Sequence, residues 1–376
     1  MNENTVVVVF PSLFSLNKMD YLVSSISTIL KLKKLSFSKI RRNGSVIIVE
    51  TDDPVFASSA IGSLFGIEKI AIAKETKNSF NVIVSAITTV GTNLLLRGER
   101  FYVKVEGTGK EYVPKDIELA ATSSLIEKTV DFQTKPGTES DHDKIIYTYI
   151  TKSHAYVCIF IDKCWGGVPY QSQNEKALCG IYDEISVISC LQTLKMGFDV
   201  KILVCYTNEL ELLRMVKMIN QVLPKLLQTK IELHFCRLDI KSSGGSILFK
   251  IAIITEILVS LAKETKMDRI SLAISPLIFP AWFIEYNAKS VFQKGVIPWF
   301  PLSGIDNSIF ETANEIGLGK YMSKIESLCK TRFKKDLSKD KVSRVSQNSF
   351  LGLKTITITP GPKNIHEIID SLKSNH

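Results

Sequence analysis

The stretch GGVPYQSQNEKALCGIYDEISVISCLQTLKMGFDV, residues 166–200, has the outline of a nucleotide-binding unit. A short apolar strand runs into a polar break, then into a helix-like segment, and then into a glycine and another strand. In an α/β domain, the loop between such a strand and its helix places phosphate on the helix N-terminus. Between the strand and Gly197, however, this loop has Gly180 as its only glycine, and two carboxylates, Asp183 and Glu184, follow it. The stretch therefore predicts the frame of a phosphate site with unusual loop chemistry.

The residues that follow this stretch continue its pattern. Strands are predicted at 200–206, 230–236 and 269–275, and helices at 183–196, 208–226 and 247–265. Regular alternation of strands and helices is typical of a parallel, doubly wound sheet. The glycine-rich segment CWGGVPYQSQ (164–173) indicates a linker in front of this domain, which we expect to span residues 166–376.

The residues before the linker predict two smaller α+β domains. The first, residues 1–75, has strands at 5–10, 44–50 and 68–75, a helix over 18–33, and a second helix with Asp53 as cap and Pro54 in its first turn. The second, residues 76–165, has a helical start after Ser79, a strand in ERFYVKVEGTG, a helix with Pro114 and Asp116 near its cap, and two strands in IIYTYIT and HAYVCIFI.

Charge is the most informative property of the composition. The 376 residues carry 47 Lys and Arg against 38 Asp and Glu, a formal net charge of +9, which is consistent with a polyanionic partner. Six basic residues and no acid lie in 31–42, and nine basic residues with three acids lie in 320–344. Each run is also what a solvated protein face would show.

Cysteine usage and hydropathy predict a cytoplasmic protein that does not bind membranes. No two cysteines form a CxxC pair, and several lie in apolar strand-like runs, as buried reduced thiols do. The apolar runs are shorter than a membrane span, and the N-terminus lacks the basic start of a secretory signal. The histidines show no metal-ligand spacing, so no metal site is predicted.

Three segments in order along the chain resemble one family. GERFYVKVEGTGKEYVPKDIELAATSSLIEK (98–128) is similar to a THUMP domain, and HAYVCIFIDKCWGGVPYQSQ (154–173) resembles the junction between that domain and an ATP-pyrophosphatase domain. GVIPWFPLSGIDNSIFETANEIGLGKYMS (295–323) is similar to a later segment of the same family. The family is that of the ThiI-type tRNA 4-thiouridine synthetases, and the resemblance covers nearly the whole chain.

The resemblance implies a ferredoxin-like domain and a THUMP domain that bind tRNA, followed by a Rossmann-like domain of the adenine nucleotide alpha hydrolase type. That third domain adenylates a uridine and replaces its oxygen with sulfur carried as a cysteine persulfide. Adenylation needs a PP-loop of the form SGGxDS. A gapless register places Ile181 to Ser186 at this motif, and only Ser186 agrees with it, so Ser186 is the one candidate nucleotide-binding residue.

The departures from this motif predict a lost nucleotide site. Tyr182 and Asp183 replace the glycines, and Asp183 and Glu184 would act instead as helix cap and dipole partners. A second glycine-rich and glutamine-containing stretch of the family corresponds here to the apolar LAISPLIFPAWFI (272–284). We therefore expect a pseudoenzyme without a cofactor, with ATP and Mg²⁺ required only if the altered site is active.

Sulfur chemistry and a second phosphate loop each have one candidate. Cys329 lies near the position where archaeal members carry a cysteine, so it is the candidate persulfide residue, although no second cysteine lies close to it. The segment KSSGGSILFK (241–250) could be mistaken for a PP-loop, but it has no aspartate, and we interpret it as a helix cap.

RNA binding through the N-terminal domains is the predicted function. The residues expected to contact RNA phosphates are Lys31, Lys33, Lys34, Lys39, Arg41, Arg42, Arg97, Arg100, Lys104, Lys110 and Lys115. One alternative is an active tRNA sulfurtransferase with an altered site. Another is an adaptor or homodimer, in which Trp282 and Trp299 of the C-terminal domain dock a protein partner.

Overall fold

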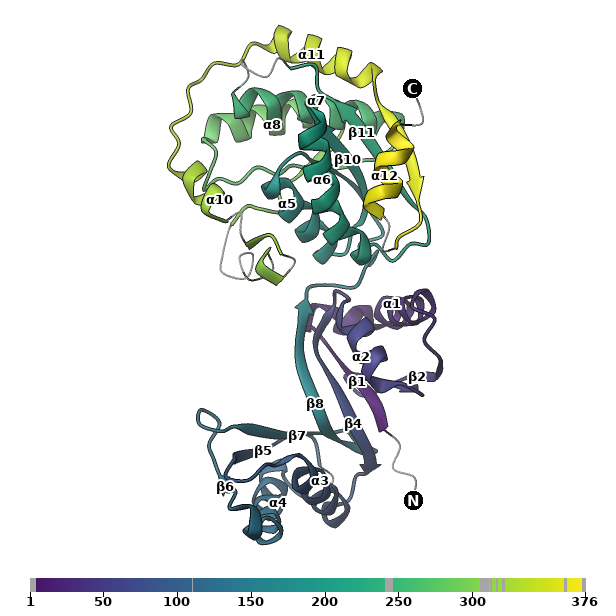
Figure 1. Ribbon diagram of the computed structural model, residues 1–376, viewed down its shortest axis with the longest axis vertical. Helices are drawn as coiled ribbons and strands as arrows, with labels where there is room; N and C mark the ends of the chain where they lie inside the picture. Colours follow the sequence, from purple (N-terminus) through teal and green to yellow (C-terminus); the bar gives the residue numbers. More distant parts are fainter. Residues whose placement is uncertain are drawn as a thin grey trace. The chain divides into compact units, whose positions relative to one another are not determined.

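The computed structural model describes residues 5–109, 111–240, 246–304, 311, 313–315, 317–319, 322–361 and 364–373. The chain divides into two compact units, Met1–Pro169 and Tyr170–His376, and each combines a sheet with covering helices (Figure 1). The predicted fold class, α+β followed by a mainly parallel α/β sheet, is confirmed. The finer division at 1–75, 76–165 and 166–376 stays a prediction.

The first unit is built on one eight-stranded sheet with the order β2-β3-β1-β4-β8-β7-β5-β6. The strands are β1 (Thr5–Pro11), β2 (Phe37–Asn43), β3 (Val46–Thr51), β4 (Ile67–Lys77), β5 (Arg100–Gly107), β6 (Lys135–Pro136), β7 (Lys144–Ile150) and β8 (His154–Gly166). Neighbouring strands are antiparallel except that β5 runs parallel to both β6 and β7. Sequence reasoning missed β2, which overlaps the basic run 31–42, because its alternation of apolar and charged residues also fits a solvated surface.

Four helices accompany this sheet, together with 3₁₀ turns at Leu13–Lys18 and Val130–Phe132. The helices are α1 (Met19–Leu32), α2 (Pro54–Gly62), α3 (Phe80–Leu94) and α4 (Pro114–Lys128). Asp53 caps α2 by accepting a hydrogen bond from Phe56 N–H at 3.0 Å, and Pro54 stands in the first turn, as predicted. Asp116 accepts a hydrogen bond from Val113 N–H at 3.3 Å and so closes the start of α4.

The core of the first unit lies on both faces of its sheet. Val6, Val7, Val8 and Val9 of β1 are at most 1% exposed, which explains why this strand is an unbroken apolar run. In the second half of the sheet, α3 and α4 pack closely because Gly91 has no side chain. A Cβ atom at Gly91 would lie 2.6 Å from Leu125 Cδ2 and 2.7 Å from Ile146 Cδ1.

The longest pairing in this unit joins β4 to β8. The two strands run antiparallel from the pair Ile67 and Gly166 to the pair Lys77 and His154, with register shifts on the way. β8 is 13 residues long and also pairs with β7. It therefore connects the two halves of the eight-stranded sheet.

The second unit contains a six-stranded sheet with the order β13-β12-β9-β10-β11-β14. The strands are β9 (Lys176–Ile181), β10 (Asp199–Tyr206), β11 (Ile231–Arg237), β12 (Arg269–Ser271), β13 (Ile297–Trp299) and β14 (Lys354–Ile358). All pairs are parallel except that β14 is antiparallel to β11. Strand order reverses beside β9, since β10 and β11 follow on one side and β12 and β13 on the other. The carboxyl end of β9 is thus a topological switch point, where such folds bind ligands.

Helices cover both faces of this sheet. They are α5 (Glu184–Lys195), α6 (Glu209–Val222), α7 (Ile247–Glu264), α8 (Ala281–Gln293), α10 (Met322–Cys329), α11 (Lys339–Leu351) and α12 (Asn364–Lys373). Two successive residues of β9 point to opposite faces of the sheet, because side chains alternate along a strand. Cys179 hydrogen bonds to Cys190 of α5, whereas Gly180 faces Leu258 of α7, 3.1 Å from where a Cβ would lie.

Three segments depart from the sequence expectations. The strand predicted at 269–275 ends at Ser271, because Ser275 begins a turn in which its carbonyl oxygen accepts hydrogen bonds from Ile278 and Phe279 N–H. The linker predicted at 164–173 is shorter than expected, since β8 continues through Gly166. The helix predicted over 208–226 ends as an α-helix at Val222 and continues as a 3₁₀ turn to Lys225.

Candidate functional site

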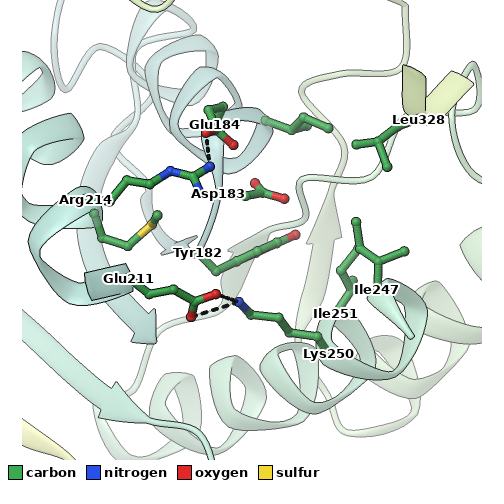
Figure 2. Close-up of a pocket in the computed structure, with 11 residues that line it drawn as sticks. Tyr182, Asp183, Glu184, Glu211, Arg214, Ile247, Lys250, Ile251 and Leu328 are labelled. Carbon is green, nitrogen blue, oxygen red and sulfur yellow. Dashed lines mark hydrogen bonds and ion pairs between the residues drawn. The ribbon is translucent and has the colours of Figure 1, made fainter. Parts of the chain in front are cut away.

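A cavity lies at the switch point, where β9 and β10 end and α5, α6 and α7 begin (Figure 2). Its volume is about 150 Å³. Its lining comprises Tyr182, Asp183, Glu184, Ile185, Glu211, Arg214, Met215, Ile247, Lys250, Ile251 and Leu328. This is the place that the resemblance assigns to the nucleotide.

The start of α5 is closed by its own side chains. Ser186 N–H donates a hydrogen bond to Asp183 Oδ1 at 2.8 Å, and Asp183 N–H donates to Ser186 Oγ at 2.9 Å. Tyr182 N–H also donates to Ser186 Oγ at 2.9 Å. A phosphate bound at the start of α5 would need these same N–H groups as hydrogen-bond donors. Asp183 is therefore a cap, as predicted, and the hydroxyl of Ser186, the candidate nucleotide ligand, is engaged in the same cap.

Two ion pairs cross the cavity (Figure 2). Glu184, with a side chain only 3% exposed, pairs with Arg214 of α6, and Glu211 of α6 pairs with Lys250 of α7 at 3.2 Å. Burial opposes ionisation of Glu211, but hydrogen bonds from Thr207 and the nearby Lys250 ammonium outweigh it and lower the pKa of Glu211. The cations of the cavity are thus held by carboxylates of the same cavity.

Tyr182, which the resemblance aligns with a motif glycine, points its ring into the cavity (Figure 2). Burial, and to a smaller extent the Asp183 carboxylate, raises the pKa of Tyr182 well above its ordinary value, so the phenol is neutral. A bulky neutral ring and the carboxylates of Asp183, Glu184 and Glu211 therefore line this cavity.

The second family motif is also replaced by a packed segment. Ile278 and Phe279 are 5% and 3% exposed, and Phe279 stacks on Phe333 with ring centroids 5.7 Å apart. Ser275 is fully buried, and its carbonyl oxygen accepts the hydrogen bonds that form the turn between β12 and these residues. This segment has a core role and presents no polar group comparable to the glutamines of the family.

The size and the charge of this cavity do not fit the triphosphate of ATP. Ligand pockets for small molecules and cofactors measure roughly 300–1,000 Å³, whereas this cavity holds about 150 Å³. Among the residues that the structure describes, no group of three or more His, Cys, Asp or Glu side chains could hold a metal ion. We therefore derive no adenylation step at this cavity.

The candidate sulfur carrier lies beside the cavity. Cys329 is the last residue of α10 and is exposed, and its neighbour Leu328 lines the cavity. Five of the other cysteines are buried and Cys164 is half-buried, which agrees with the interpretation of these thiols as core residues. The loop 241–245 of the second glycine-rich segment lies outside the described residues, and Ser246 caps α7 by accepting a hydrogen bond from Phe249 N–H.

Ion pairs engage about half of the basic residues predicted to bind RNA. Arg41 pairs with Glu50 at 3.1 Å and with Glu75, and Arg42 pairs with Asp20. Burial disfavours the charged form of Arg41, but its hydrogen bonds to Glu75, Tyr156 and Glu50 raise the pKa of Arg41 above its usual range. These two arginines therefore hold β2 to its neighbours as well as adding charge.

The same holds around β5. Ion pairs in this region join Arg100 to Asp141 (2.5 Å) and Asp143 (3.6 Å), Lys104 to Glu139 (2.8 Å) and Glu106 (3.3 Å), and Lys115 to Glu118 (2.8 Å). Exposed residues that form no ion pair within the described ranges are Lys31, Lys33, Lys34, Lys39 and Arg97. Lys110 lies outside the described residues.

The two tryptophans proposed as docking anchors have partners inside the second unit. Trp299 lies 5.2 Å from Phe198 between ring centroids, and Arg269 stacks above both rings. Trp282 meets Phe283 edge-on at 5.7 Å. No helix in the described ranges is long and apolar enough to span a membrane.

Sequence reasoning missed three residues of the cavity, namely Glu211, Arg214 and Lys250. A usable signal was available, because the first two turns of helices that follow parallel strands lie at the same edge as the strand-to-helix loops. Glu211 and Arg214 stand in the first two turns of α6, and Lys250 stands in the first turn of α7.

Comparison with known proteins agrees with this fold. No protein-family model matches the chain. A probable tRNA sulfurtransferase of Methanosarcina mazei is 23% identical over 189 residues, 50% of this chain and 46% of that protein. One from Methanosarcina acetivorans is 24% identical over 155 residues, 41% of this chain and 37% of that protein. The matches thus span less than half the length of these curated relatives.

Two solved structures share the architecture. PH1313 from Pyrococcus horikoshii aligns with a TM-score of 0.64 and 16% identity, covering 84% of this chain and all of that one. A 4-thiouridine synthetase in complex with RNA and bound ATP aligns with a TM-score of 0.67 and 15% identity, covering 95% of this chain and all of that one. By its distant sequence relatives and its fold, the chain resembles the ThiI-like tRNA sulfurtransferases.

Proposed function

We propose that this protein binds RNA, and that this RNA is tRNA. We also propose that the cavity at the switch point neither binds nor uses ATP. RNA binding is supported by the relation to tRNA sulfurtransferases and by the shared fold of a synthetase that was solved with RNA. The loss of nucleotide chemistry is supported by the cavity at the switch point. On this proposal the protein is a pseudoenzyme that needs no ATP or Mg²⁺.

The observation that carries the proposal is the closed start of α5. Its N–H groups already donate to Asp183 and Ser186, so a phosphate would have to displace a formed cap. Glu184 is buried against Arg214 in the same place, and its negative charge would repel a triphosphate. Pocket volume, hydrogen bonding and charge therefore all oppose ATP.

RNA contact is proposed at the basic residues of the first unit that form no ion pair within the described ranges. Lys31 lies in the last turn of α1, Lys33 and Lys34 follow the helix, and Lys39 lies on β2, so these four side chains belong to one continuous segment. Lysines of this kind neutralise phosphates without reading bases, which fits recognition of the shape of an RNA stem or end.

A filter-binding titration with bulk tRNA at several salt concentrations tests the RNA half of the proposal. We expect binding that weakens as salt rises, and weaker binding with a smaller salt slope for the variant in which Lys31, Lys33, Lys34 and Lys39 become Gln. Absent binding, or binding that does not depend on salt, would refute RNA recognition. Equilibrium dialysis with radiolabelled ATP tests the other half, and saturable binding at millimolar ATP would refute it.

An active tRNA sulfurtransferase is the second candidate. It is favoured by the near-complete alignment with the ATP-bound synthetase, since the whole second unit keeps its fold. ATP-dependent formation of thiolated tRNA with a protein persulfide as the sulfur donor, which can pass its outer sulfur to a cysteine thiol, would establish it when measured by retardation on a mercury gel. We expect no ATP-dependent product, and Cys329→Ala separates persulfide transfer from background thiolation if any product forms.

A further inference from the structure

The basic residues near the C-terminus form a second charged surface, which the proposed function does not use. Residues 330–344 contain two acids, Asp336 and Asp340, against seven basic residues. The basic residues are Lys330, Arg332, Lys334, Lys335, Lys339, Lys341 and Arg344. All seven are exposed, and none forms an ion pair with another residue in the described part of the chain. They contrast with the eleven residues of the first unit that were predicted to bind RNA, five of which form ion pairs with carboxylates.

Apolar contacts hold this segment on the protein. Phe333 stacks on Phe279, with centroids 5.7 Å apart and an angle of 29° between the rings. Val342 is 1% exposed within α11, which packs against α7. Residues 332–338 have neither helix nor strand between these two anchors. The backbone of this segment runs along the second unit from α10 to α11 (Figure 1), and its exposed cations are presented along that path.

A polar groove adjoins this line. It lies between α8 and the start of α11, has a volume of about 320 Å³, and is lined by Lys289, Lys294 and Lys339 with Glu256 as its one carboxylate. Serines, Gln293 and Tyr286 complete most of the lining and offer further donors. Lys294 pairs with Glu256, and Lys289 pairs with Glu285, whose pKa is lowered first by Lys289 and also by the field of Lys335.

The positive charges at the start of α11 do not serve its helix, whereas Asp340 in the same turn suits the helix dipole. Ser338 caps α11, and Lys339 and Lys341 stand in the first turn, where the helix dipole disfavours positive charge. The same dipole adds to the positive potential of this surface, because helix N-termini attract anions. Stability of α11 therefore does not account for these two lysines, and their charge adds to a positive potential that suits an anionic partner.

We infer that residues 330–344 and the adjoining groove form a second contact surface for the RNA phosphate backbone, on the unit that contains the former nucleotide site. The inference rests on the proposed RNA binding and adds to it a role for the second unit. A protein partner would need aromatic or aliphatic anchors at the centre of the surface, and a membrane would need apolar side chains to insert. Here Phe333 and Val342 are packed against the protein instead.

The expected size of the effect follows from counterion release. Each phosphate contact contributes up to about 0.9 to the slope of log K against log salt. Four contacts would thus lower the slope by up to about 3.6 and, at 0.1 M salt, each would change affinity by up to about eightfold. A loss well beyond tenfold is expected when four of the seven cations are removed together.

The test compares two variants of the full chain with equal change in charge. The first replaces Lys334, Lys339, Lys341 and Arg344 by Gln, which keeps a high helix propensity. The control replaces four other exposed lysines of the second unit by Gln. These lysines lie at the amino edge of the sheet or in the turn before β12, and they are Lys176, Lys230, Lys263 and Lys266. Filter binding of tRNA over a salt series is measured for both, with circular dichroism melting curves as the check on folding.

The outcomes separate this inference from the proposed function. If the first variant loses affinity and slope and the control does not, the surface contacts RNA. Equal binding by wild type and the first variant would overturn the inference while leaving RNA binding by the first unit intact. Equal losses in both variants would also overturn it, because net charge alone would then explain the effect. Absence of RNA binding by the wild-type protein would overturn both.

Discussion

Removal of the Arg214 side chain should leave the Glu184 carboxylate without its ion-pair partner at the start of α5. The Glu184 side chain is 3% exposed and that of Arg214 is 38% exposed, so the carboxylate and not the guanidinium bears the cost of desolvation. Breaking a buried pair by deleting one partner costs about 3–5 kcal/mol. The helix dipole at the N-terminus of α5 offsets about 0.3–1 kcal/mol of that cost. Water that reaches the space left by the Arg214 side chain also solvates the carboxylate.

We therefore expect Arg214→Met to lower the free energy of unfolding by about 2–3 kcal/mol. For a unit of this size that corresponds to a melting temperature lower by roughly 4–12 °C. Urea and thermal unfolding followed by circular dichroism and tryptophan fluorescence measure the change. The double variant Glu184→Gln with Arg214→Met should recover most of the loss, because no charge is then left buried.

Lys250→Met is the matched control, since it breaks the other ion pair of the same cavity. Glu211 is more exposed than Glu184 and keeps hydrogen bonds from the N–H and hydroxyl groups of Thr207, both at 2.9 Å. A loss of at most about 1 kcal/mol is expected. If both single variants lose the same small amount, or if the double variant is less stable than Arg214→Met, the argument from the buried carboxylate is wrong.

Two further predictions concern packing and pH. Gly91→Ala should destabilise the first unit by about 1–3 kcal/mol in urea unfolding despite the better helix propensity of alanine, because its Cβ would collide with Leu125 and Ile146. The control Thr89→Ala, on the exposed face of α3, should change the free energy of unfolding by less than about 0.5 kcal/mol. Equal effects of the two substitutions would contradict the packing argument. Burial first of all lowers the pKa of His234 below 6.5, so its contribution to stability is complete above pH 6.5 and declines as the pH falls through 6.5 towards the folded-state pKa. Urea midpoints between pH 7.5 and 5 should fall less steeply for His234→Gln than for the wild type; a steeper fall would refute the assignment.

Much of the fold could be predicted from local signals in the sequence. The valines of β1, the cap at Asp53 and the alternation after residue 166 each act within a few neighbouring residues. The loop chemistry was equally local, because Asp183 and Ser186 are three residues apart and form a cap with each other. These features do not depend on which distant segments pack nearby.

Features that depend on distant partners could not be predicted. The strand at 269–275 was expected to continue, but Ser275 forms a turn that buries Ile278 and Phe279 against the rest of the second unit. β14 runs antiparallel to β11, which the alternating pattern does not indicate. The partner of Glu184 is Arg214, 30 residues away, so the sequence suggested only an interaction of Glu184 with its own helix.

The β4–β8 ladder has a consequence for synthesis of the chain. Its partners are separated by 77 residues at Lys77 and His154 and by 99 residues at Ile67 and Gly166. At about 5–20 residues per second, a ribosome would leave the edge of β4 open for roughly 4–20 s. During that interval the nascent strand is protected by the charges that interrupt its apolar residues, Glu68, Lys69, Lys74, Glu75 and Lys77. The charged residues of β4 thus guard against aggregation before β8 exists.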